Sequence, residues 1–306
     1  MIGGAPDHMR PALSPAGVEF IPAASMSDAM RALKAVKSPD VINTHMTEAD
    51  LVGAVSTVFR GGRLVSTRHF ASRRGSKALL RPVFSWAGQR FSAQIAISHF
   101  VADAIEGDSV VVHTGVADAP AAATEERDRT VLVAQRLERE KDTATAIRAW
   151  SRTTAARNGW RLVVAGDGVE RDELARLAHE LGVGETTDFV GHLADVGGAM
   201  RRAGMLLAPT PREGLGLSVL EAMAHALPVV ASASGGHLET AGEVAPSRLF
   251  EPRNADAAAE IVDSLAADDA GRAEYGAALR TRQRERFSID AQVERTIALY
   301  EEVVSR

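Results

Sequence analysis

The sequence predicts an α/β protein with two Rossmann-like lobes, each built around a parallel sheet. Short runs of β-branched residues alternate with amphipathic stretches along the chain, which is the pattern of successive β-α units. The length of 306 residues suggests about two domains, at the usual ~100–200 residues each. The pattern breaks at residues 117–129, an Ala-rich, acidic segment that lacks a periodic apolar stripe and so indicates an interdomain linker.

The predicted organisation is therefore an N-terminal domain at 1–116, the linker, a C-terminal domain at 130–288 and a closing helix at 289–306. Strands of the N-terminal domain are expected at residues 18–21, 40–43, 64–67, 95–98 and 110–112. Strands of the C-terminal domain are expected at 130–134, 161–165, 187–190, 205–208, 229–231 and 248–250. Helices are expected at 143–157, 170–181, 195–202, 216–226, 255–266, 271–286 and 289–304. In such sheets ligands bind beyond the C-terminal ends of the strands.

The composition excludes several classes of protein. A formal net charge of −5 argues against a basic nucleic-acid binder. The absence of cysteine excludes disulfides, iron–sulfur clusters and thiolate zinc sites. No apolar run approaches the ~18–20 residues that cross a bilayer, and no basic leader precedes an apolar stretch at the start. We therefore expect a cytoplasmic protein.

A glycine-led helix start follows the strand expected at 205–208. Gly214 and Gly216 allow the backbone to come close to a ligand. The free amides of Gly216, Leu217 and Ser218 at the start of a helix favour an anion the size of a phosphate, and the helix dipole adds to this. The junction therefore predicts a phosphate site.

Two glutamates flank this junction. Glu221 lies in the second turn of the helix, where its carboxylate can accept hydrogen bonds from two vicinal hydroxyls such as those of a ribose. Glu213 precedes the helix and can meet sugar hydroxyls. The alternative is that Glu213 is a solvated loop charge and Glu221 an exposed helix residue. Their place at a strand–glycine–helix junction favours the functional interpretation.

Two cations lie just beyond the strand expected at 130–134. Arg136 and Lys141 can neutralise a diphosphate, because arginine binds two oxygens at once and lysine acts as a point charge. The alternative is a solvated basic loop that pairs with Glu138 and Glu140.

The combination of motifs is more specific than any one of them. In chain order they are Arg136-Leu137 with Lys141, Ala-Gly-Asp-Gly at 165–168, Phe-Val-Gly at 189–191, Glu213 and Glu221 enclosing seven residues, Ala-Met-Ala at 222–224 and the strand at 228–232. This order resembles the nucleotide-binding lobe of a retaining glycosyltransferase of family 4, which has the GT-B fold. The resemblance covers residues 130–306.

The resemblance implies a role for each matching residue. Arg136 and Lys141 match the pair that holds the donor's diphosphate, Glu221 the glutamate on the ribose, and Glu213 the one near the donor sugar. Leu217 and Ser218 match the residues at the start of the helix whose backbone amides bind the phosphate. The implied reaction moves a sugar from a nucleotide-diphosphate sugar, most commonly a UDP-sugar, to a glycan, lipid or small-molecule hydroxyl, with retention and without a cofactor. No Asp-x-Asp motif is present, so we expect no metal ion.

The N-terminal half resembles the family more loosely. His45 and His69 each follow an expected strand, and the resemblance places His69 against the donor sugar and acceptor, while His45 is expected to be structural. One departure is Asp142 after Lys141, where the family commonly has glycine; it adds a carboxylate beside the phosphate cation.

A second departure is the short N-terminus. Residues 18–21 match the family's third strand, so the lobe is expected to lack its first β-α-β unit of ~35–40 residues. The exposed strand edges would be covered by rearrangement, by a homo-oligomer, or by upstream sequence. The alternative function is a non-catalytic nucleotide-sugar-binding or partner protein derived from such an enzyme.

The segment 68–91 suggests a contact with a membrane surface. Residues 68–90 hold six basic and no acidic side chains, interleaved with apolar and aromatic ones. Such a segment can lie on an anionic membrane at the inner face, each cation adding ~1 kcal/mol. The alternative is that its apolar side packs on the sheet.

Overall fold

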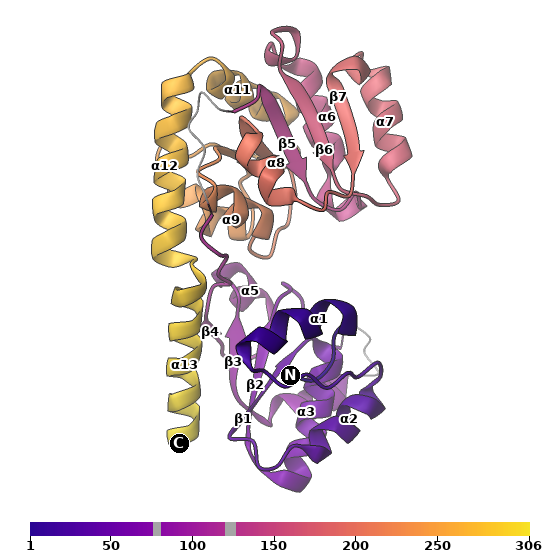
Figure 1. The fold of residues 1–306 in the computed structure, drawn as a ribbon, viewed down its shortest axis with the longest axis vertical. Helices are drawn as coiled ribbons and strands as arrows, with labels where there is room; N and C mark the ends of the chain where they lie inside the picture. The colour runs from indigo at the N-terminus through magenta and orange to yellow at the C-terminus, as the bar shows by residue number, and fades with distance from the viewer. Residues whose placement is uncertain (76–80, 120–126) are drawn as a thin grey trace. The chain divides into compact units, whose positions relative to one another are not determined.

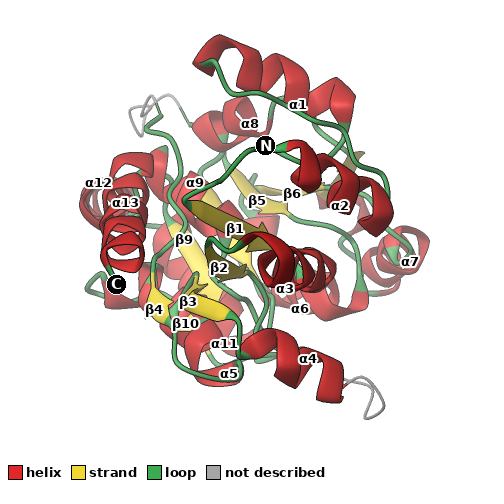
Figure 2. Ribbon diagram, turned by 90° about the horizontal axis from the view of Figure 1, so that it is seen from below, coloured by secondary structure: helices red, strands yellow, loops and turns green. Residues whose placement is uncertain are grey.

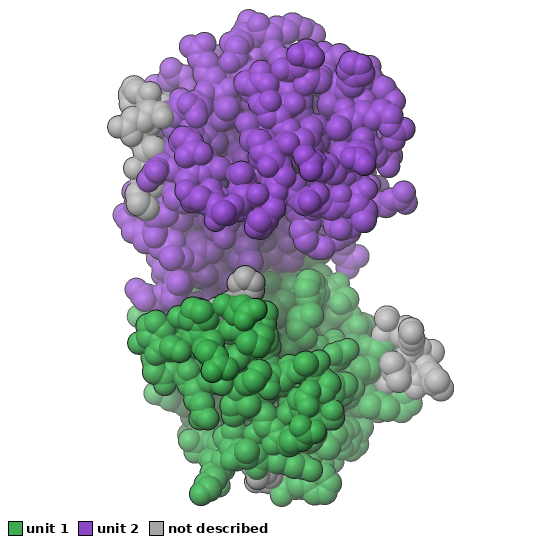
Figure 3. All heavy atoms as spheres, turned by 45° about the vertical axis from the view of Figure 1, so that its right-hand side comes forward, with its two compact units in different colours: residues 1–112, 294–306 green, residues 113–293 purple. Residues whose placement is uncertain are grey.

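The computed structural model describes residues 1–75, 81–119 and 127–306, and the chain divides into two compact units. Unit 1 comprises residues 1–112 and 294–306, and unit 2 comprises residues 113–293 (Figure 3). Much of the predicted linker at 117–129 lies outside the described residues. Each unit is an α/β structure with its own parallel sheet, which confirms the predicted fold class.

Unit 1 holds a four-stranded parallel sheet in the order β1-β2-β3-β4 (Figure 1). Its strands are β1 (Val41–His45), β2 (Arg63–Arg68), β3 (Phe91–Ala96) and β4 (Val110–Val111). Its helices are α1 (Pro6–Leu13), α2 (Met26–Ala35), α3 (Thr47–Arg60), α4 (Arg81–Gly88) and α5 (His99–Ala104). A 3-10 turn, η1 (Ser14–Ala16), follows α1.

Both faces of this sheet are covered. Successive residues of a strand point to opposite faces, so Leu64 and Val65 of β2 enter two different clusters. Leu64 packs with Ala54 of α3 and Ala87 of α4. Val65 packs with Ile95, Val112 and two residues of α13 (Ile289–Ser305), namely Leu299 and Val303. The last part of α13 is therefore part of unit 1.

Unit 2 holds a six-stranded parallel sheet in the order β10-β9-β8-β5-β6-β7. Its strands are β5 (Thr130–Ala134), β6 (Arg161–Ala165), β7 (Thr187–Gly191), β8 (Met205–Ala208), β9 (Val229–Ser232) and β10 (Leu249–Phe250). The strand order reverses between β5 and β8, which makes this the switch point of a doubly wound sheet. Ligands of such sheets bind in the crevice at that point.

Helices accompany the strands of unit 2 (Figure 2). They are α6 (Thr143–Arg152), α7 (Arg171–Glu180), α8 (Val196–Arg202), α9 (Leu217–Ala224), α10 (Gly236–Glu239), α11 (Ala255–Ala266) and α12 (Asp269–Arg286), with 3-10 turns η4 (Arg139–Lys141), η5 (Ala155–Arg157), η6 (Gly184–Thr186) and η7 (Ala241–Glu243). Every residue of β8 and β9 is buried. Such strands are uniformly apolar because helices cover both faces.

The predicted strand at 18–21 is wrong. These residues form no strand, and their only bridge joins Ile21 to Ile2. Val18 is 41% exposed, so the apolar run has no sheet on which to bury itself. Within the described residues β1 is consequently an edge strand of the sheet.

Most other boundaries agree with prediction to within about two residues, and two elements differ by more. The strand expected at 95–98 begins earlier, at Phe91, and Ser98 instead caps α5 by accepting a hydrogen bond from the amide of Val101. The helix expected at 143–157 ends at Arg152, because Thr153 is extended, and a separate turn follows at Ala155–Arg157. Among the described residues, no helix has the length and apolar character needed to cross a bilayer.

Candidate functional site

Two adjoining pockets lie at the switch point of unit 2. The wide pocket, of about 310 Å³, is lined by the ends of β5 and β6 and by α8 and α9; Arg136, His192 and Glu221 are among its residues. The narrow pocket, of about 20 Å³, is lined by Lys141, Glu213 and the start of α9. Ala134, Gln135 and Ser218 line both pockets, so the two share one wall. Four predicted site residues with charged side chains therefore surround one continuous region of the strand ends.

A turn that requires glycine sets the start of α9. Gly216 has a φ of +93°, and a Cβ there would lie 2.9 Å from Cδ2 of His237. Gly235 has a φ of +57°, and a Cβ there would lie 2.1 Å from the carbonyl oxygen of Glu213. L side chains rarely adopt such φ values, and at Gly235 no Cβ fits so close to the backbone of Glu213. The two glycines thus allow the loop before α9 to pack against the loop before α10.

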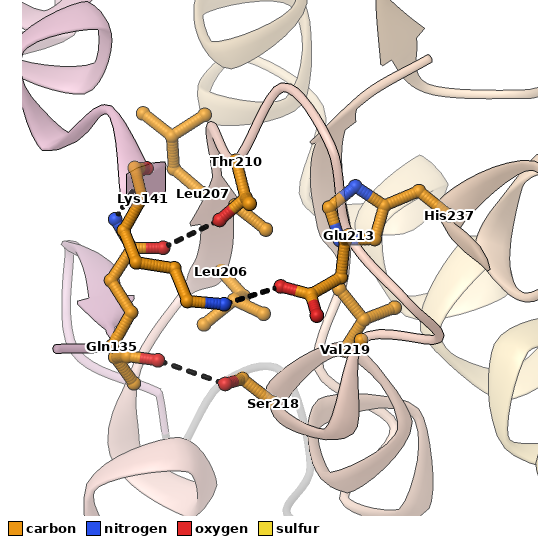
Figure 4. Close-up of a pocket in the computed structure, with 12 residues that line it drawn as sticks. Gln135, Lys141, Leu206, Leu207, Thr210, Glu213, Ser218, Val219 and His237 are labelled. Carbon is orange, nitrogen blue, oxygen red and sulfur yellow. Dashed lines mark hydrogen bonds and ion pairs between the residues drawn. The ribbon is translucent and has the colours of Figure 1, made fainter. Parts of the chain in front are cut away.

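Hydrogen bonds fix this junction to the central strand (Figure 4). The Ser218 hydroxyl donates to the carbonyl oxygen of Ala134 at 2.9 Å, which ties α9 to the end of β5. The Thr210 hydroxyl donates to Oε1 of Gln135 at 3.1 Å, which ties the end of β8 to the same strand. The helix start is therefore held in place before any ligand binds.

Lys141 and Glu213 form an ion pair across the narrow pocket. Nζ of Lys141 lies 2.7 Å from Oε2 of Glu213, and each side chain is about one-fifth exposed, at 20% and 21% (Figure 4). The second carboxylate oxygen, Oε1, accepts the amide of Gly214 at 3.1 Å. The lysine and the glutamate that were predicted to serve the phosphate and the sugar thus contact each other directly.

Arg136 and Glu221 face the wide pocket and remain more open. The Arg136 side chain is 68% exposed, and among the described residues it pairs with Glu140, 3.1 Å away. Glu221 is exposed on α9, and partial desolvation by the surrounding protein raises the pKa of its carboxyl above the usual value. Neither group is locked into the fold, which leaves both able to bind a ligand.

The structure explains the aspartate that follows Lys141. Asp142 adopts the left-handed conformation, with φ 50° and ψ 44°, at the start of α6. Glycine and, less readily, aspartate or asparagine accept this conformation, so the backbone at this position tolerates Asp142. Oδ2 of Asp142 accepts a hydrogen bond from the Thr145 hydroxyl at 2.7 Å. Its carboxylate is therefore engaged by the first turn of α6.

The two strand-end histidines of unit 1 contact each other. Nδ1 of His45 lies 2.9 Å from Nε2 of His69, and the rings stack with centroids 5.2 Å apart. Partial burial lowers the pKa of both rings; Asp50 opposes this for His45, and His45 adds to it for His69. His45, which the sequence left as structural, is thus the partner of His69.

The basic segment at 68–91 is less open than its sequence indicated. The side chains of Arg68 and Arg74 are buried and paired with acids from other elements: Glu106 for both, and Asp50 for Arg74. Arg90 stacks on Trp86, with the guanidinium carbon 4.5 Å from the ring centre. Lys77 lies outside the described residues. Two of the six cations therefore serve the fold, because the acids that neutralise them come from outside the segment.

Sequence reasoning missed several lining residues of the two pockets, among them His192 of the wide pocket and His237 of the narrow one. His237 lines the narrow pocket and is 1% exposed. The available signal was the Gly-Gly pair at 235–236, which begins three residues after the end of β9 and forms a second glycine-rich turn at the ligand edge of the sheet.

Comparison with known families decides the affiliation of the chain. The family Glycosyl transferases group 1 matches residues 117–285, which is more than half of the chain. The chain belongs to this family. The family Glycosyltransferase Family 4 matches residues 4–119 of the same glycosyltransferase. The predicted resemblance is thereby confirmed for both halves.

Curated relatives are 28–33% identical to this chain over the aligned part. The glycogen synthase of Mycobacterium tuberculosis is 29% identical over 86% of this chain and 68% of its own length. The GDP-mannose-dependent alpha-(1-6)-phosphatidylinositol monomannoside mannosyltransferase of the same organism is 33% identical over 53% of this chain and 46% of its own. An exopolysaccharide phosphotransferase of Streptomyces coelicolor is 28% identical over 58% of this chain, which spans 19% of that protein. The glycosyltransferase thus spans less than two thirds of two of these three relatives.

Solved structures share the fold. Anabaena HepE, solved in complex with UDP and glucose, superposes with a TM-score of 0.79 at 19% identity, covering 95% of this chain and 89% of that one. Sucrose-phosphate synthase from Thermosynechococcus elongatus superposes with a TM-score of 0.76 at 22% identity, covering 94% and 81%. Together with the two parallel sheets, these likenesses confirm the predicted GT-B architecture of two Rossmann-like lobes.

Proposed function

We propose that this glycosyltransferase moves a sugar from a nucleotide-diphosphate sugar to an acceptor hydroxyl, with retention at the anomeric carbon and without a metal ion. The observation that carries the proposal is the gathering of Arg136, Lys141 and Glu221 around two pockets that share a wall at the switch point. A volume of about 310 Å³ for the wide pocket lies at the lower end of the ~300–1,000 Å³ typical of ligand sites.

The donor is oriented by the chemistry of the residues. The nucleoside occupies the wide pocket, where the Glu221 carboxylate accepts hydrogen bonds from the two ribose hydroxyls. The diphosphate lies at the start of α9, where free backbone amides and the helix dipole favour an anion. Arg136 approaches it from the wide pocket and Lys141 from the narrow one. The sugar then extends toward Glu213.

The chemical difficulty is the departure of the diphosphate. The C1–O bond to the phosphate breaks, its electron pair goes to the phosphate oxygen, and positive charge develops at C1. Fixed cations and amides stabilise the leaving charge as it forms, and the loss of one such group typically costs ~2.7–4 kcal/mol of transition-state stabilisation. The acceptor oxygen attacks from the face that the phosphate leaves, and a phosphate oxygen takes the acceptor proton. No protein nucleophile is required.

The relatives support the reaction class and the donor class. The mannosyltransferase of M. tuberculosis is named as GDP-mannose-dependent, and HepE was solved with UDP and glucose. Both names refer to nucleoside diphosphates, which fits two cations beside a phosphate site. We propose UDP-sugars as the first donors to test.

The test is a donor panel with product analysis. The purified chain is incubated with UDP-glucose or GDP-mannose and a panel of sugar and lipid acceptors, in EDTA and in Mn²⁺, and release of the nucleoside diphosphate is measured. We expect equal release in both conditions and, by NMR, a product with the anomeric configuration of the donor. Release only with Mn²⁺ contradicts metal independence, and a product of inverted configuration contradicts retention. Binding of the donor without any release contradicts the proposal that the chain is an enzyme.

A further inference from the structure

A buried histidine beside the narrow pocket carries an inference that goes beyond this assignment. His237 lies in α10 and is 1% exposed. Its ring fills the space above Gly216, and it is drawn beside Glu213 in Figure 4. Both His237 and Glu213 line the narrow pocket. The imidazole is thus a wall of the proposed sugar site.

The hydrogen bonds of the ring determine which nitrogen carries the proton. Nδ1 lies 3.1 Å from the backbone carbonyl oxygen of Ser232, which can only accept, so Nδ1 donates. Burial lowers the pKa of His237; the charge of Glu213 acts in the opposite direction and that of Lys141 in the same one. The ring is therefore neutral, and Nε2 offers a lone pair. Among the described residues, none forms a hydrogen bond with Nε2.

We propose that Nε2 of His237 accepts a hydrogen bond from a hydroxyl of the transferred sugar and so selects neutral, hydroxyl-bearing donors over donors with a carboxylate at that position. The inference rests on the proposed function and adds a specificity-determining residue to it. Because Nε2 accepts no hydrogen bond from another described residue and His237 lines the narrow pocket, a sugar hydroxyl that binds there supplies the missing donor.

The other polar groups of the narrow pocket favour the same donors. The Glu213 carboxylate is an acceptor, and the Thr210 hydroxyl already gives its hydrogen to Gln135. Among the described residues that line this pocket, the cation is Lys141, which is paired with Glu213. A carboxylate beside Nε2 would therefore face a lone pair and a second carboxylate. The present volume of about 20 Å³ holds roughly one water, so the Lys141–Glu213 pair must part to admit a sugar ring.

Two variants of His237 test the contributions of Nδ1 and Nε2 separately. In His237→Asn the side-chain amide can still donate to the Ser232 carbonyl, but no acceptor reaches the position of Nε2. In His237→Gln the amide oxygen reaches that position, but the donor to Ser232 is lost. We expect His237→Asn to weaken binding of the sugar nucleotide about 5- to 100-fold and His237→Gln to retain more of it, while the affinity for UDP alone changes less than about twofold in both.

The decisive probes are UDP-glucose, its 2-, 3-, 4- and 6-deoxy analogues and UDP-glucuronate, with UDP as the reference. We expect one deoxy analogue to lose affinity in the wild type and to lose nothing further in His237→Asn, and UDP-glucuronate to bind less tightly than UDP-glucose. The inference is overturned if each deoxy analogue loses affinity relative to UDP-glucose by the same factor in the wild type and in His237→Asn. It is also overturned if His237→Asn weakens the binding of UDP as much as the binding of UDP-glucose. If UDP and UDP-glucose fail to bind the wild type at all, the proposed function fails with it.

Discussion

The charged groups near the strand ends of the two units are used in opposite ways. In unit 1, the Arg74 and Asp50 side chains are each 1% exposed, and Nε of Arg74 lies 2.5 Å from Oδ2 of Asp50. Arg74 also donates to Glu106, Gln94 and Ser66. In unit 2, the Arg136 side chain is 68% exposed and, within the described part of the chain, pairs with the exposed Glu140.

This difference shows why the same residue types mean different things in the two sheets. A buried guanidinium with every partner in place holds elements together and is costly to disturb. An open guanidinium at a switch point adds little to stability and keeps its hydrogen-bonding capacity for a ligand. Charges in unit 1 should therefore control stability, and those in unit 2 should control binding and turnover.

The largest expected effect is in unit 1. Arg74→Met leaves the Asp50 carboxylate buried without its cation, so the free energy of unfolding should fall by ~3–5 kcal/mol. Chemical denaturation measures it. The matched variant Arg136→Met, in unit 2, should change the free energy of unfolding by less than ~0.5 kcal/mol. Equal losses of unfolding free energy in Arg74→Met and Arg136→Met would contradict the difference proposed between the two units.

The next effect is on turnover. Lys141→Met removes the cation nearest the departing phosphate, so the turnover number should fall about 100- to 1,000-fold while the melting temperature stays nearly the same. Arg139→Met is the control, because Arg139 lies on the same 3-10 turn but its side chain is 87% exposed. If Arg139→Met is as inactive as Lys141→Met, the specific role of Lys141 is refuted.

A smaller effect concerns the ribose. Glu221→Gln weakens the hydrogen bonds to two vicinal hydroxyls, so affinity for UDP should fall about 10- to 100-fold. The 2′-deoxy nucleotide dUDP should bind the wild type less tightly than UDP does, and the variant should discriminate less between the two. Calorimetry measures both affinities. Unchanged discrimination in the variant would show that Glu221 does not meet the ribose.

The smallest effect is a pH dependence of unit 1. The folded-state pKa values of His45 and His69 lie below the ordinary value of 6.5, so the unfolded chain binds protons more readily. Stability from this source is present above pH 6.5 and is lost as the pH falls through the folded-state pKa values. The slope should be less than ~1.4 kcal/mol per pH unit for each histidine, because solvent screens both rings.

The double variant His45→Asn with His69→Asn should flatten that slope between pH 7 and pH 5. Denaturation at several pH values tests this. If the slope of unfolding free energy against pH is unchanged in the double variant, the pH dependence comes from other groups.

The sequence predicted unit 2 more closely than unit 1, for a physical reason. The bounds of β5, β6 and β8 match the predicted strands, because central parallel strands are buried on both faces and stand out as continuous apolar runs. Residues 18–21, Val-Glu-Phe-Ile, also combine β-branched and aromatic residues but join no sheet, and only tertiary structure reveals this.

The site was predicted in part, for a related reason. Gly216, Glu213 and Glu221 lie close together in the chain, so their spacing alone indicates a ligand-binding junction. The pairing of Arg74 with Asp50 joins different elements, and nothing in the sequence marks those two among the other charges. The proton position on His237 depends on the Ser232 carbonyl, which is a property of the folded chain.

The central claim is that Arg136, Lys141 and Glu221 hold one nucleoside diphosphate at the switch point of unit 2. Calorimetric titration of the wild type and of Arg136→Ala, Lys141→Ala and Glu221→Gln with UDP, GDP and ADP tests it most directly. We expect one of the three nucleotides to bind the wild type at a single site, with an affinity at least about tenfold weaker in every variant. Absence of binding by all three, or binding that none of the substitutions weakens, would contradict the claim.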